Sequence, residues 1–188
     1  MKDIWELAKA NEAYIIDRRR YYHAHPEPSM QEVETTKAIA KDLEALGIEY
    51  KTFPDHTGVL GVIRGGKPGK GIMLRADIDG LSGVHEATGL PFASQNPDCM
   101  HACGHDTHIS VLLGAAKILN EIKDELCGTI NLCFEPAEET LQGASLMIQD
   151  GCLDGMDACF GMHTWSAGTS GKASFMKGNI MAAGGKFT

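Results

Sequence analysis

Residues 100–119 read MHACGHDTHISVLLGAAKIL. The second half of this stretch repeats apolar residues at the spacing of one helix face, and Asp106 or Thr107 stands where an N-cap is expected. The first half places a thiol, three imidazoles and a carboxylate within nine residues. The stretch therefore predicts a helix over 109–122 that carries metal-capable side chains at its N-terminal end.

Strand-like and helical patterns alternate around this helix. The sequence predicts strands at 71–76 and 129–134, a short helix at 143–149 and a further strand at 157–162. Such an alternation is typical of an α/β fold with a mostly parallel sheet flanked by helices. The length of 188 residues, 43% of them hydrophobic, fits one such domain.

The N-terminal third predicts two helices and two strands. Apolar positions at helical spacing indicate a first helix over 3–22, and Ser29 with Glu32 has the pattern of a capping box for a second helix that ends at Gly47. Strands follow at 48–53 and 58–64. The turn sequence GGKPG then predicts a hairpin between strands 58–64 and 71–76.

Charge and composition exclude several classes of protein. The net charge of -8 argues against a nucleic-acid surface. No apolar run approaches the roughly 20 residues of a membrane span, and the N-terminus lacks a signal-peptide core. The six cysteines lack the spacing of a disulfide scaffold, so we expect reduced thiols, most of them in the core, in a cytoplasmic protein.

Polar side chains gather where the predicted strands end. In open parallel sheets, binding sites form at the carboxyl ends of the strands, so segments that follow different strands converge there. The residues placed in this way are Asp77 and Asp79 after strand 71–76, Cys103, His105 and Asp106 before helix 109–122, Glu138 and Glu139 after strand 129–134, and His163 after strand 157–162.

A thiolate and an imidazole separated by one residue, as in Cys103 and His105, are good donors for zinc-like ions, and Glu139 and His163 bring the donors to four. For a single thiol or imidazole, burial in the core or helix capping is the more common role. Convergence from separate strands favours a metal site. The neighbouring Glu138 could act on a metal-activated water.

Other polar residues of this region leave alternatives open. Asp77 and Asp79 could support the ligands from behind or only hold loops by accepting backbone hydrogen bonds. His101 and His108 are weaker candidates for the site. The two histidines of YYHAHPEP are at least as well explained as a helix end with ring packing.

Six stretches of the chain resemble one known family. They are RRRYYHAHPEPSMQEVETT, IMLRADIDGL, ATGLPFAS, MHACGHDTHISVLLGAAKIL, FEPAEETLQGASLMIQDG and DACFGMHTW, and they cover most of residues 18–165 in order. The family is that of the metal-dependent N-acyl-amino-acid amidohydrolases, which includes aminoacylases, hippurate hydrolases and indole-acetyl-amino-acid hydrolases.

The resemblance implies a two-metal hydrolase that cleaves the amide between an acyl group and an amino acid. Cys103, His105, Glu139 and His163 would be ligands of zinc, manganese, nickel or cobalt, and Glu138 would be the general base. Asp106 would lie beside His105 as a supporting residue, with Asp77 and Asp79 as further candidates for that role.

Members of this family are roughly twice as long as this chain. Residues 1–188 are therefore expected to be the N-terminal part of a catalytic domain. A lid or dimerisation domain would begin near Phe187. The rest of the catalytic domain, with a further ligand histidine, would come from a continued chain or from a complementing chain. The expected partners are a small N-acyl amino acid and either a second copy in a homodimer or such a complementing chain. Two alternatives stay open: a catalytically idle domain that binds metal or a partner, and a thiol redox protein that uses Cys99 and Cys103.

Overall fold

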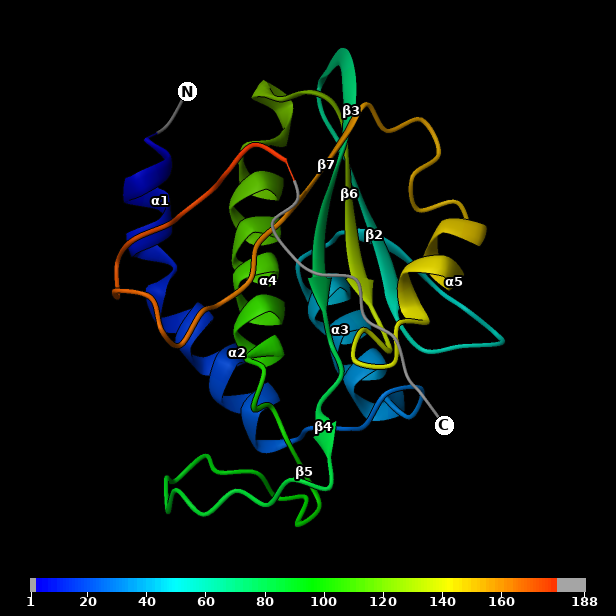
Figure 1. The fold of residues 1–188 in the computed structure, drawn as a ribbon. Helices are drawn as coiled ribbons and strands as arrows, with labels where there is room; N and C mark the ends of the chain where they lie inside the picture. The colour runs from blue at the N-terminus through cyan, green and yellow to red at the C-terminus, as the bar shows by residue number, and fades with distance from the viewer. Residues whose placement is uncertain (1–2, 179–188) are drawn as a thin grey trace.

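A five-stranded mixed sheet forms the centre of the molecule in the computed structural model, which describes residues 3–178. Across the sheet the strand order is β1-β2-β6-β3-β7 (Figure 1). The strands are β1 (Glu49–Thr52), β2 (Val59–Arg64), β3 (Lys67–Asp77), β6 (Cys127–Glu135) and β7 (Ala158–Gly161). Strand β2 is antiparallel to both of its neighbours and the other four strands run in one direction, so the prediction of a mostly parallel sheet is confirmed.

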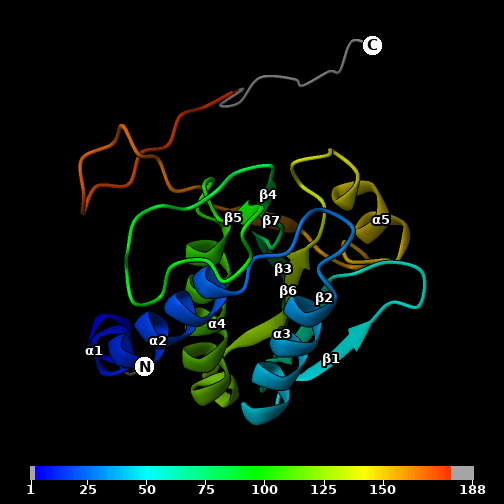
Figure 2. The same ribbon diagram turned by 90° about the horizontal axis from the view of Figure 1, so that it is seen from below.

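Helices cover both faces of this sheet. One face carries α2 (Glu12–Ala24), α3 (Val33–Ala45) and α4 (His105–Glu121), with α1 (Ile4–Ala10) beside α4, and the other face carries α5 (Gly143–Gln149) (Figure 2). The remaining elements are a small sheet of β4 (Leu81–Ser82) and β5 (Cys99–Met100) and a 3-10 turn, η1 (Lys123–Glu125). Within residues 3–178, no helix combines the length and the apolar character that crossing a membrane requires.

Two hydrophobic clusters hold the layers together. Alternate residues of β6 point to opposite faces, as the pleat of a strand requires, so that Leu132 and Phe134 join the large cluster under α2, α3 and α4, while Cys133 joins the small one under α5. Ile109 and Leu113 of α4 are fully buried in the large cluster. Burial of this face fixes α4 against the sheet and places its N-terminal end at the carboxyl edge of β3 and β6.

The predicted hairpin at GGKPG is wrong. Strands β2 and β3 are consecutive in the chain, but β6 lies between them and pairs with both. The hairpin partner of β2 is β1. The chain reverses its direction at the glycine- and proline-rich residues 65–69, as predicted, but this turn does not determine which strand pairs with β2.

Three helix boundaries also differ from the prediction. The first helix is broken at Asn11, whose side-chain amide donates to the Leu7 carbonyl at 2.9 Å and ends α1. The capping box is absent, because Ser29 donates to Asp79 and the Glu32 carboxylate accepts from the Ala137 backbone instead.

Helix α4 has Gly104 in a left-handed conformation at its N-cap, and no side chain caps it, so the expected cap at Asp106 or Thr107 is wrong.

The cysteines match the expectation of buried, reduced thiols only in part. All six are free thiols, but three are buried, Cys103 is half-buried and Cys127 and Cys159 are exposed. The expected start of an inserted domain near Phe187 lies outside the described residues.

Candidate metal centre

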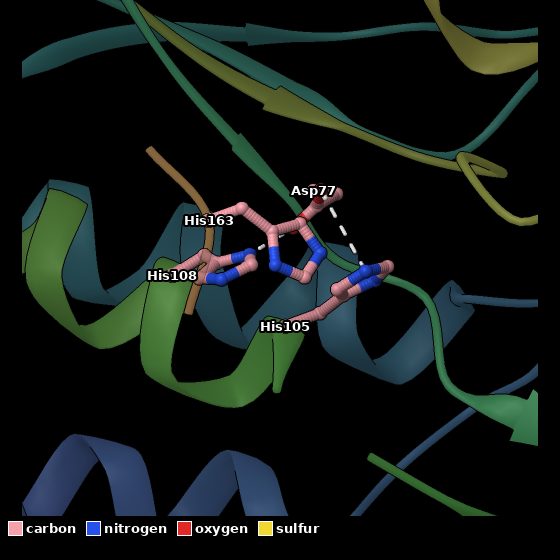
Figure 3. A group of neighbouring side chains, drawn as sticks. All are labelled: Asp77, His105, His108 and His163. Carbon is pink, nitrogen blue, oxygen red and sulfur yellow. Dashed lines mark hydrogen bonds and ion pairs between the residues drawn. The ribbon is translucent and has the colours of Figure 1, made fainter. Parts of the chain in front are cut away.

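Four segments of the chain meet at the carboxyl edge of the parallel strands. Asp77 ends β3, Glu138 and Glu139 follow β6, and His163 follows β7, while α4 presents its first turn to the same place. Figure 3 shows Asp77, His105, His108 and His163 with their side chains directed toward one another. The convergence expected from the strand ends is therefore present.

His105 is completely buried and offers one free nitrogen. Its Nδ1 lies 2.9 Å from the backbone oxygen of Asp79, which can only accept, so Nδ1 carries the proton. Its Nε2 forms no hydrogen bond within the described residues. This atom lies 3.8 Å from Glu138 Oε2 and 3.7 Å from Glu139 Oε1, which leaves its lone pair aimed at carboxylates.

Asp79 ties this imidazole to the loop after β6. Its Oδ2 accepts a hydrogen bond of 2.6 Å from the Ser29 hydroxyl and one of 3.0 Å from the Glu139 backbone N–H. Burial opposes the ionisation of Asp79, but the hydrogen bonds from His105, Ser29 and Glu139 outweigh it and hold its pKa below the usual value. Asp79 thus fixes the positions of His105 and Glu139 together.

The loop that carries Glu138 and Glu139 is held by a buried carboxylate. Ala137 has a left-handed backbone with φ 51°, and its N–H donates to Glu32 at 2.7 Å. Glu32 is fully buried and also accepts a short hydrogen bond from Thr57. The sequence predicts only a capping role for Glu32, because its backbone partner Ala137 lies more than a hundred positions away.

Glu138 lies beside His105 with its side chain 33% exposed, so it reaches solvent. Burial, together with the negative charge of Asp77, raises its pKa above the ordinary value. A carboxylate that meets both solvent and the donor cluster can exchange a proton with a water molecule at this edge.

Cys103 and His163 come together from two loops. The Cys103 Sγ atom lies 3.4 Å from His163 Nε2, and His163 Nδ1 donates to the Thr164 carbonyl at 2.5 Å. The free nitrogen of His163 therefore faces the sulfur. Burial and the neighbouring Glu139 carboxylate raise the pKa of the Cys103 thiol to about 12 in the metal-free protein.

Asp77 is held by groups on three sides. Arg75 donates to its Oδ2 at 2.6 Å and also binds Glu135 at 2.6 Å, while His108 Nδ1 lies 2.5 Å from its Oδ1. Burial opposes the ionisation of Asp77, but the hydrogen bond from His108 and the charges of His105 and Arg75 lower its pKa to about 2. His108 lies closer to the donor cluster than its rank as a weaker candidate suggested. Its position three residues after His105 places both histidines on one helix face.

Asp106 points to the N-terminal helices. Its Oδ2 lies 2.8 Å from His23 Nδ1 and 2.9 Å from Arg19 Nε, and His23 Nε2 lies 3.2 Å from Glu86 Oε1. His23 lies at the end of α2 and packs edge to face against Phe92, as expected, but it is also part of a buried ionic cluster that the sequence did not predict. Asp106 anchors α4 to α2, one residue away from His105. Buried His101 lies nearby, and burial lowers its pKa to about 4.

The donor atoms fit a divalent ion. Cys103, His105 and Glu139 offer ligand atoms that all lie within 4.8 Å of one another, as do Asp77, His105, His108 and His163. Glu139 Oε1, like His105 Nε2, is buried without a hydrogen bond, an arrangement that a cation between the two atoms would satisfy. A thiol, imidazoles and carboxylates together suit zinc-like metals.

The family model for peptidase family M20/M25/M40 matches residues 73–178, more than half of the chain and all of the segments that converge here. The chain belongs to this family. Its relatives in this family include an N-acetyl-L-cysteine deacetylase of Bacillus subtilis, 46% identical over 94% of this chain and 42% of that protein. They also include the thermostable carboxypeptidase 1 of Saccharolobus solfataricus, 47% identical over 91% of this chain and 44% of that protein.

Among solved M20 structures, a dinuclear metal-binding peptidase of Bacillus subtilis superposes with a TM-score of 0.80 and 47% sequence identity. The superposition covers 84% of this chain and 44% of that structure. The resemblance inferred from the sequence motifs is thus confirmed. The chain spans less than half the length of these relatives.

Proposed function

We propose that this chain forms the catalytic edge of a metal-dependent hydrolase that cleaves the amide bond of N-acyl or N-aromatic-acyl amino acids. The observation that carries the proposal is the buried pair of His105 Nε2 and Glu139 Oε1, which lie 3.7 Å apart without hydrogen bonds. The name of the deacetylase relative supports an N-acyl amino acid as substrate. The solved dinuclear peptidase supports two ions.

In this proposal Cys103, His105, Glu139 and His163 hold two divalent ions, which are zinc, manganese, nickel or cobalt. Bound there, the ions would polarise the scissile carbonyl and lower the pKa of a water toward about 7. The supporting residues are Asp79, which orients His105 through its Nδ1–H, Asp77, whose charge faces the same imidazole, and Asp106, which anchors the helix.

Glu138 is the general base. It takes a proton from the attacking water and passes it to the amine of the departing amino acid, so that the amide C–N bond breaks with no net consumption of protons. The raised pKa of this carboxyl suits a group that must both accept and release a proton. The exposed part of its side chain leaves room for the substrate.

Residues 1–188 form the N-terminal part of the catalytic domain in this proposal. Four protein ligands leave two ions with open positions, so a continued chain or a complementing chain would supply the remaining ligand and the lid. A homodimer is a further possible assembly of this chain. The thiol ligand and six unpaired cysteines favour the reducing cytoplasm. A second candidate is an idle metal-binding domain, which the same donor cluster would also form.

Elemental analysis of the purified chain after buffer exchange tests the centre directly. A ratio of one or two equivalents of zinc-like metal, lost in the Cys103→Ala variant, is the expected result. A wild-type chain that retains no metal under any loading condition overturns the proposal. Release of acetate from N-acetyl amino acids by the loaded protein would then identify an enzyme and exclude the idle domain.

A further inference from the structure

His108 lies in the donor cluster, but both of its ring nitrogens are already engaged. Nδ1 lies 2.5 Å from Asp77 Oδ1. Nε2 accepts a hydrogen bond of 2.9 Å from the Thr164 backbone N–H. The proton of His108 is thereby fixed on Nδ1, and the lone pair of Nε2 is used by Thr164.

The same Thr164 peptide holds His163. The Thr164 carbonyl accepts the Nδ1–H of His163 at 2.5 Å, which directs His163 Nε2 toward Cys103 at 3.4 Å. His163 is exposed to solvent and follows the short edge strand β7, so little packing restrains its ring. Its ring also meets that of His108 edge to face, with centroids 4.6 Å apart.

We infer that His108 is a positioning residue, which orients the candidate ligand His163 through the Thr164 backbone and does not itself bind metal. Asp77 fixes the tautomer of His108, His108 fixes the Thr164 peptide, and that peptide fixes the ring of His163. That this series of contacts matters for metal binding rests on the proposed function. The orientation of the His163 ring is a property of the metal-free protein, so it can be measured whether or not the proposed function holds.

Two isosteric substitutions separate the two ring contacts of His108. In His108→Gln the side-chain amide oxygen takes the place of Nε2 and can still accept from Thr164, while in His108→Asn the amide nitrogen takes the place of Nδ1 and keeps only the contact with Asp77. Long-range nitrogen–proton NMR spectra of the imidazoles in the metal-free chain report the tautomer of His163. Exposed His85, changed to Gln, is the matched control.

The expected result is that His163 keeps the Nδ1-protonated form in wild type, His108→Gln and His85→Gln, and averages between tautomers in His108→Asn. Zinc affinity should fall about 10- to 100-fold in His108→Asn alone, as is typical when a group that orients a ligand is lost. Loss of one metal equivalent in both His108 variants would instead make His108 a ligand and overturn the inference.

A lower melting temperature in His108→Asn with an unchanged His163 spectrum would show a structural role only, and would also overturn it. If wild type binds no metal while the His163 tautomer still depends on residue 108, the proposed function fails and the positioning role stands. The two ideas are thus tested by different measurements on the same samples.

Discussion

His105 Nε2 and Glu139 Oε1 face each other across 3.7 Å, and neither atom makes a hydrogen bond with any residue in 3–178. Each comes from a separate element, and Asp79 binds the ring of one and the backbone of the other. Leaving two buried polar atoms unpaired costs about 1–3 kcal/mol each, so the fold carries an energetic penalty that a cation can remove.

Zinc or cobalt should therefore stabilise the chain. At a free ion concentration of about 100 times the dissociation constant, the free energy of unfolding should rise by about 2.7 kcal/mol, which corresponds to about 5–10 °C in Tm. Thermal unfolding of the metal-free protein with added Zn²⁺ measures this. Mg²⁺ is the control ion, because it disfavours thiolate and imidazole ligands; equal shifts with both ions would contradict a site built on Cys103 and His105.

Glu138 and Glu139 are neighbours with different expected roles. Glu138→Gln should reduce hydrolysis by about 100- to 10,000-fold because the proposed general base is lost, and it should leave the metal content unchanged. Glu139→Gln should lower the metal content itself, because the buried oxygen of a proposed ligand is replaced. The metal-to-protein ratio and the initial rate are measured for both variants. Loss of metal in Glu138→Gln would instead indicate that Glu138 is the ligand and Glu139 the base.

Gly104 has φ 86° and lies against Thr164, so that a Cβ at this position would collide with Thr164 Oγ1. Gly104→Ala should displace Thr164 and with it His163, and zinc affinity should fall about tenfold or more. Gly83 has φ 73° with no atom near the site of a Cβ, which makes Gly83→Ala the matched control for backbone strain alone.

Both variants should lose about 1 kcal/mol of stability, since alanine is disfavoured in the left-handed region. Zinc titrations by calorimetry compare them. Equal zinc affinity in the two variants would mean that the contact between Gly104 and Thr164 does not matter for the metal.

The metal-free protein should lose stability in acid through Asp77. Its pKa of about 2 in the folded state lies below the ordinary 3.8, so the ionised group favours folding above about pH 5, and this contribution disappears as the pH falls toward 2. The shift corresponds to about 2 kcal/mol. Urea unfolding at pH 5 and pH 2 should show the stability difference between wild type and Asp77→Asn shrinking by this amount; a constant difference would refute it.

Leu141 adopts φ 59° although its side chain is 64% exposed. A leucine in this region is strained by about 1–2 kcal/mol and gains little from burial here. Leu141→Gly should remove the backbone strain, although glycine also gives the unfolded chain more freedom and so offsets part of this gain. The free energy of unfolding should therefore rise by about 0.5–1 kcal/mol. Denaturant unfolding checks the sign, with Leu141→Ala as the variant that keeps the strain.

Local patterns predicted the elements better than their arrangement. The bounds predicted for the short helix GASLMIQ agree with those of α5, because the chain leaves the helix at Asp150 and Gly151, where glycine adopts a left-handed backbone. The order of the strands could not be obtained in this way, since β6 lies between β2 and β3 in the sheet but begins about fifty residues after β3 in the chain. Neighbours in a sheet depend on which faces are buried together, and no local turn encodes that.

The candidate site shows the same division. The donors could be proposed from their positions after strands, but what fixes them depends on distant backbone groups. Glu32 binds the Ala137 N–H, and His108 binds the Thr164 N–H. Backbone partners carry no trace in the side-chain sequence, so a residue that binds one looks like any other polar residue until the fold is known.

The placement of β6 also bears on how the protein is made. Val59 of β2 and Asp77 of β3 pair with Phe134 and Glu135, at the end of β6. During synthesis β2 and β3 leave the ribosome well before their common partner, and both must wait with unpaired edges while the chain grows past residue 135. Sheets that depend on such distant pairings form slowly and expose apolar strands in the meantime. The nascent chain is thus most prone to aggregation, and most in need of a chaperone, in the interval before its central strand emerges.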